Sequence, residues 1–177
     1  MFRHFHLTRR QWLGLLRWGL YALLFLLTVV FQSVVLARLP VFGAKLTVIP
    51  TLLCCICIRE GSEKGGLFVL LASLFWGLSG VDYGNLSIFL LPALCILFSE
   101  LCSRLLSDRF FSVWICCLLT VLLHESVLFV FKLLLTNIAP TSYWEILLPG
   151  VAFSLLLYPL YYLLVKLISR IGGDYGV

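Results

Sequence analysis

Residues 18–37 read WGLYALLFLLTVVFQSVVLA, twenty positions without a charged side chain. As an α-helix this stretch is about 30 Å long, which matches the hydrocarbon thickness of a bilayer. The whole chain has the same character, because 62% of its 177 residues are apolar, 12% are charged and the mean hydropathy is +1.10. A soluble domain has about half apolar and about a quarter charged residues. The composition excludes a soluble globular enzyme, a disordered tail and a nucleic-acid-binding module, and it predicts one membrane domain.

Five further apolar runs follow, separated by short connectors rich in Pro, Gly and charged residues. We expect an all-α, polytopic integral membrane helical bundle with six transmembrane helices. Their ranges are 18–37, 41–58, 65–81, 86–106, 110–131 and 144–165. Pro and Gly interrupt the second, third and fourth runs, so five spans are the alternative. A small-residue motif at 35–37 resembles a signal-peptide cleavage site, but the long apolar run favours a retained span.

The basic residues predict the orientation of this bundle. With the N-terminus inside, ten Lys and Arg residues fall on the inner side and three on the outer side, which follows the positive-inside rule. The inner residues are Arg3, Arg9, Arg10, Arg17, Arg59, Lys64, Arg104, Arg109, Lys166 and Arg170; the outer residues are Arg38, Lys45 and Lys132. We expect a cytoplasmic basic segment at 1–17, a single helical domain at 18–168 and a cytoplasmic tail at 169–177. The connectors leave no room for a separate extramembrane domain.

A few polar side chains within the spans are the candidates for function. His124 and Glu125 lie deep in the fifth span, where an ionisable group is costly and needs a partner. They could relay protons or bind a ligand, but we favour a structural or partner-contact role. Adjacent helix positions point about 100° apart, so the two are not expected to serve one site. Lys132 shares a face with Glu125, and Gln32 in the first span could bond to a neighbouring helix.

Other residues are assigned packing or pairing roles. Glu100 and Arg104 have the i,i+4 spacing of a local ion pair. Pro50 should kink or interrupt the second span. The glycines of the third span and its preceding turn should let neighbouring helices approach closely; they are Gly65, Gly66, Gly77 and Gly80. Seven cysteines lie in or beside apolar runs without the spacing of a zinc ribbon, and no His or carboxylate accompanies Cys54 and Cys57 in their run. We therefore expect small hydrophobic side chains, no metal and no cofactor.

Several short motifs resemble those of the MreD family, the small membrane subunit of the bacterial rod-shape system. They are the Gln32-Ser33 pair, LPVFGAK at 39–45, the glycine turn at 61–66, LFWGLSG at 74–80, LHE at 123–125, and Pro149-Gly150 with Pro159. The likeness covers roughly residues 18–170. Two features depart from the family pattern: the proline comes at Pro50, five positions after Lys45, and Gly77 stands where the family often has aspartate.

The resemblance implies a non-enzymatic subunit in the bacterial plasma membrane. It would act with an MreC-like bitopic protein and, through it, with wall-synthesising enzymes and the MreB filament. A homodimer is a further alternative that the sequence leaves open. The family is also similar in fold to the substrate-binding subunits of energy-coupling-factor vitamin transporters, so a vitamin-binding subunit is the second hypothesis. Leu23 and Leu26 stand where the docking helix of such subunits typically has small residues, which disfavours that hypothesis.

Overall fold

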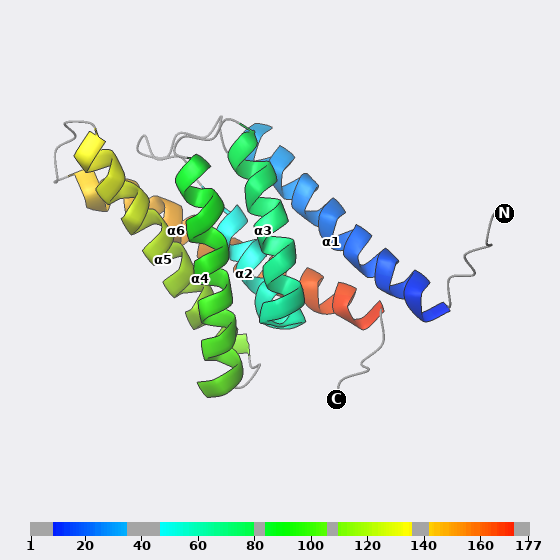
Figure 1. Cartoon of the computed structure of the whole chain (residues 1–177). Helices are drawn as coiled ribbons and strands as arrows, with labels where there is room; N and C mark the ends of the chain where they lie inside the picture. Colours follow the sequence, from blue (N-terminus) through cyan, green and yellow to red (C-terminus); the bar gives the residue numbers. More distant parts are fainter. Residues whose placement is uncertain (1–8, 35–46, 80–83, 106–109, 136–141, 172–177) are drawn as a thin grey trace.

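The structure is a computed structural model, and it describes residues 9–34, 47–79, 84–105, 110–135 and 142–171. This part of the chain contains six α-helices and no strand, which confirms the all-α prediction. The helices are α1 (Arg9–Val34), α2 (Ile49–Glu60), α3 (Ser62–Leu78), α4 (Gly84–Leu105), α5 (Phe110–Leu135) and α6 (Ser142–Ile171) (Figure 1). Helix α1 begins at Arg9, so it extends into the basic segment that precedes the first predicted span.

In the described ranges, four helices are long and apolar enough to cross a membrane, and the chain is therefore a membrane protein. The candidate spans are Gln11–Val34, Leu86–Arg104, Phe110–Leu135 and Leu147–Ile171. Large apolar side chains on the outward faces of these helices, such as Leu27 and Leu163, are well exposed and suited to contact lipid tails. The six spans expected from the sequence stay a prediction, because α3 has 17 residues and α2 only 12.

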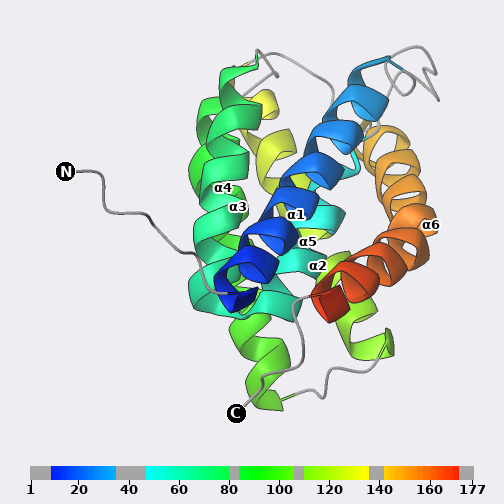
Figure 2. The same ribbon diagram turned by 90° about the vertical axis from the view of Figure 1, so that its right-hand side faces the viewer.

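Helix α2 lies at the centre of the bundle and packs against all five other helices (Figure 2). Every residue from Ile49 to Ile58 is buried. At 12 residues α2 is about 18 Å long, roughly half of a membrane crossing. A helix that is apolar on all sides can be covered by protein as well as by lipid. The second predicted span thus contains a short inner helix, and its residues 41–46 lie outside the described part.

Pro50 occupies the first turn of α2 and produces no kink in a longer helix. A proline is well tolerated there because the first amides of a helix have no intrahelical acceptor. The interruption expected at Pro50 is therefore the start of α2, after the non-helical residues Thr47 and Val48.

Glycines allow α3 to return tightly against α2, as predicted. Gly61 joins the two helices with a φ of 85°, a conformation that other residues rarely adopt. A Cβ on Gly65 would lie 2.7 Å from the Cα of Cys57 in α2, and a Cβ on Gly66 would lie 2.9 Å from the side chain of Ile96 in α4. Gly77 is half-buried in α3, and Gly80 lies outside the described residues.

The helix ends gather at two opposite ends of the bundle (Figures 1 and 2). The starts of α1, α3 and α5 and the ends of α2, α4 and α6 form one end, which we call the basic end. By their positions in these helices, most basic residues of the described part lie towards this end; they are Arg9, Arg10, Arg17, Arg59, Lys64, Arg104, Lys166 and Arg170. Lys132 is in the last turn of α5, at the opposite end.

Candidate functional site

The start of α2 is held by polar side chains from three surrounding helices. We call this group, formed by Gln32, Thr47, His124, Glu125 and Ser154, the α2-start cluster. Gln32 of α1 accepts a hydrogen bond at its Oε1 from the backbone N–H of Val48, at 3.1 Å. Val48 is the residue before α2, and no side chain caps that helix in the usual way. Gln32 therefore satisfies a backbone donor where a buried helix starts, which matches its predicted role as a polar link between helices.

Glu125 of α5 supplies an acceptor in the same cluster. The Thr47 hydroxyl donates to Glu125 Oε1 at 2.7 Å, and His124 Nδ1 lies 3.4 Å from that oxygen. The expectation that His124 and Glu125 would not serve one site is therefore wrong. Their Cα–Cβ directions diverge, but the Glu125 side chain is long enough to bring its carboxylate beside the His124 ring. A carboxylate near the start of α2 also complements the positive end of the helix dipole.

Ser154 of α6 completes the contacts around Thr47. Its hydroxyl contacts the Thr47 carbonyl oxygen and lies 2.8 Å from the carbonyl oxygen of Gly150 in its own helix. Helices α1, α5 and α6 thus all bond to residues 47–48. These contacts fix where α2 begins inside the bundle.

His124 is fully buried, and one of its ring nitrogens has no hydrogen-bond partner among the residues that the structure describes. Its ring lies beside the indole of Trp76 from α3, with ring centroids 6.2 Å apart and the planes tilted by 30°. Within the described residues, His124 Nε2 has no hydrogen-bond partner, and the same holds for Thr51 Oγ1 in α2. A buried polar atom without a partner is costly. This nitrogen is the feature of the cluster that a small ligand or a water molecule could satisfy.

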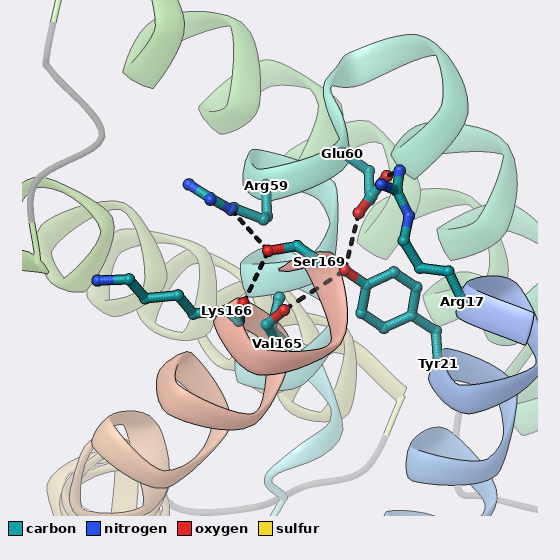
Figure 3. A network of polar contacts seen from close by, with 7 residues as sticks. All are labelled: Arg17, Tyr21, Arg59, Glu60, Val165, Lys166 and Ser169. Carbon is teal, nitrogen blue, oxygen red and sulfur yellow. Dashed lines mark hydrogen bonds and ion pairs between the residues drawn. The ribbon is translucent and has the colours of Figure 1, made fainter. Parts of the chain in front are cut away.

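The end of α2 is held by a second group, the α2-end cluster, formed by Arg17, Tyr21, Arg59, Glu60 and Ser169 (Figure 3). The Arg17 guanidinium of α1 donates to Glu60 Oε2, and the Tyr21 hydroxyl donates to Glu60 Oε1 at 2.7 Å. Only 2% of the Glu60 side chain is exposed, so this carboxylate depends on its two partners in α1.

Arg59, the neighbour of Glu60, is bound to α6 instead. Its Nε donates to the Ser169 hydroxyl at 3.2 Å, and that hydroxyl donates to the carbonyl oxygen of Lys166 at 2.9 Å. Both ends of the short buried helix are thus tied by polar contacts to the long outer helices. Between them, apolar packing dominates.

Glu100 and Arg104 form the ion pair expected from their spacing, with Arg104 Nε 3.1 Å from Glu100 Oε2. The Ser62 hydroxyl at the start of α3 also donates to Glu100, so the pair links α3 to α4 at the basic end. Lys132 is half-buried, and it shares α5 with His124 and Glu125.

The structure thus brings Gln32, His124 and Glu125 together and keeps Glu100 and Arg104 apart from them. Sequence reasoning missed Thr47 and Ser154 in the first cluster and Glu60 in the second. The i,i+4 spacing of Arg17 and Tyr21 was a usable signal, because two polar groups on one face of an apolar helix indicate a polar partner. Comparison of the chain with family models, with curated proteins and with solved structures found no match.

Proposed function

We propose that the protein is a non-catalytic scaffold subunit of the bacterial rod-shape complex. In this proposal it acts in the plasma membrane with an MreC-like bitopic protein, and through it with wall-synthesising enzymes and the MreB filament. The family motifs in the sequence suggest the partner. The structural support comes from how the bundle uses its carboxylates.

The observation that carries the proposal is the engagement of three carboxylates within the bundle. Glu60 binds Arg17 and Tyr21, Glu100 binds Ser62 and Arg104, and Glu125 binds Thr47 beside His124. Each carboxylate joins two helices or a helix and the residues before α2. Acidic groups used in this way stabilise one arrangement of the helices. A rigid bundle suits a protein that acts through the helix faces it presents to other membrane proteins.

The proposed orientation places both termini in the cytoplasm. The described ends of α1 and α6 lie together at the basic end of the bundle (Figure 2). Excess Lys and Arg in short connectors is typical of the cytoplasmic side. The opposite end, with Lys132, would face outward, towards the wall-synthesising machinery.

A second candidate function is binding of a small molecule, as in the vitamin-binding subunits of energy-coupling-factor transporters. The unpartnered His124 Nε2 at the α2-start cluster favours it, because a polar ligand would supply the missing hydrogen bond. His124 does not line the pocket near the basic end or the groove between α5 and α6, so such a ligand would bind elsewhere, at the start of α2.

Affinity purification from native membranes in mild detergent, followed by mass spectrometry, tests the proposal. We expect an MreC-like protein and wall-synthesis enzymes to be recovered. Recovery of paired ATPases with a transmembrane coupling subunit would contradict the scaffold function and support the transporter.

The variant His124→Phe separates the two functions within one protein. It keeps an aromatic ring against Trp76 and removes both ring nitrogens. The scaffold function predicts normal cell shape and normal recovery of the partner, because the partner binds outer helix faces. A loss of vitamin uptake in cells of normal shape, with the variant still folded, would support the second candidate. Leu163→Phe, at an exposed position of α6, is the matched control for adding a phenyl ring.

A further inference from the structure

Arg59 and Lys166 line one pocket at the basic end, between α2, α5 and α6. Figure 3 shows both side chains extending to the same side of the α2-end cluster, away from Glu60. Arg17 is neutralised by Glu60, but among the described residues neither Arg59 nor Lys166 forms an ion pair with a carboxylate. Arg59 donates its Nε to Ser169, and Lys166 Nζ lies 5.7 Å from the centroid of the Tyr162 ring. Within the part of the chain that the structure describes, these two positive charges have no carboxylate beside them and could attract an anion.

The remaining walls of this pocket are mostly apolar. They are formed by Cys55, Ile58, Val113, Tyr162 and Val165. An apolar wall lowers the local dielectric constant, so an anion between the two cations would be attracted more strongly than at an open surface. Arg59 also offers the remaining N–H groups of its guanidinium, whose planar geometry suits the oxygens of a phosphate.

An apolar groove lies next to this pocket along α5 and α6. Its lining residues are Phe110, Phe111, Trp114, Leu155, Leu156, Tyr158 and Pro159. The Phe110 ring joins the two sites, because its centroid is 5.1 Å from that of Tyr158 in the groove and 5.1 Å from that of Tyr162 in the pocket. Phe111 and Leu156 are 73% and 70% exposed, so the groove opens towards the lipid.

We propose that the pocket and the groove together bind one phospholipid with an anionic headgroup. The phosphate lies between Arg59 and Lys166, and one acyl chain lies in the aromatic groove between α5 and α6. The charge pattern selects this occupant, because a cationic pocket continuous with an apolar groove at the membrane surface matches an anionic head joined to a hydrocarbon tail. A bound lipid would also fill the space between α2, α5 and α6 at the basic end.

Native mass spectrometry of the purified protein tests this site. The protein is reconstituted in nanodiscs of phosphatidylcholine containing phosphatidylglycerol, released into mild detergent, and scored for the lipid that it retains. We expect retained phosphatidylglycerol in the wild type and little retained phosphatidylcholine. The double variant Arg59→Gln, Lys166→Gln should bind phosphatidylglycerol about thirtyfold more weakly, and each single variant about fivefold, because each cation near an anionic lipid surface contributes a factor of this size.

The control Lys64→Gln, Arg170→Gln removes the same charge from two exposed positions at the same end of the bundle, outside the pocket lining. It should retain phosphatidylglycerol as the wild type does, and melting temperatures show that all variants are folded. Filling the groove with Leu156→Trp should weaken lipid retention while both cations remain. Equal lipid retention by the pocket and control double variants would overturn the proposal. Displacement of the bound lipid by millimolar inorganic phosphate would also overturn it, since the site would then recognise the anion alone.

Discussion

Replacing Gly65 with alanine tests how tightly α3 packs on the buried helix α2. The added Cβ would lie 2.7 Å from the Cα of Cys57 and 3.0 Å from its carbonyl oxygen, and both atoms belong to the α2 backbone. A backbone cannot rotate away as a side chain can. To restore an ordinary contact of about 3.4 Å, α3 and α2 must separate locally by about 0.7 Å. A gap of this size forfeits a quarter to a half of the dispersion energy of the affected atom pairs.

The magnitude follows from two opposing effects. Overpacking of this kind costs about 1–3 kcal/mol, and alanine regains up to about 1 kcal/mol through its higher helix propensity. We expect Gly65→Ala to lower the free energy of unfolding by about 1–2 kcal/mol. For a chain of this length that corresponds to a decrease of about 2–8 °C in melting temperature.

Gly66→Ala is the matched control, one position along the same helix. Its Cβ would meet Cγ1 and Cδ1 of the Ile96 side chain, which is partly exposed and can shift without moving a backbone. Thermal unfolding of both variants in the same detergent compares them directly. We expect Gly66→Ala to unfold within about 1 kcal/mol of the wild type. If Gly65→Ala is as stable as Gly66→Ala, the close approach of α3 to α2 is refuted.

Three further experiments test the two polar clusters and the buried thiols. Glu60→Ala leaves Arg17 without its carboxylate and should lower the free energy of unfolding by about 2–4 kcal/mol. Tyr21→Phe removes only one hydrogen bond to Glu60 and should lower it by about 1 kcal/mol. Equal unfolding free energies of the two variants in detergent would be inconsistent with the α2-end cluster. Glu125→Ala removes the acceptor of the Thr47 hydroxyl and should speed amide hydrogen exchange at the first turn of α2. Glu125→Gln keeps an acceptor oxygen and should speed this exchange much less. Unchanged exchange rates in both variants would contradict the α2-start cluster. All seven cysteines are buried and none forms a disulfide, so a maleimide should label none in the folded protein and seven after denaturation in SDS. Rapid labelling of Cys54 in α2 or of Cys117 in α5 would contradict the packing of α2 against α5.

The membrane class and the helical fold could be predicted because they depend on composition and on long apolar runs. The Glu100–Arg104 pair was also predictable, since both residues are on one helix and four positions apart. The central position of α2 in the bundle could not be predicted. A short apolar helix buried by protein has the same sequence character as part of a span surrounded by lipid, and periodicity does not distinguish them.

The polar clusters were only partly predictable for a related reason. Gln32, His124 and Glu125 stood out because polar groups are rare within apolar runs. The pairings within the clusters could not be predicted, because the paired residues are distant in sequence. Glu60 is 43 positions from Arg17, and Ser154 is 107 positions from Thr47. Thr47 and Ser154 also have small side chains that are common in membrane helices, so their types gave no signal.

Cell width after depletion of the protein tests the proposed function most directly. The scaffold function predicts that rod-shaped cells widen and become round as the protein is lost, and that the wild-type chain, and equally His124→Phe, restores the rod. Cells that keep their normal width while losing uptake of a vitamin would contradict it.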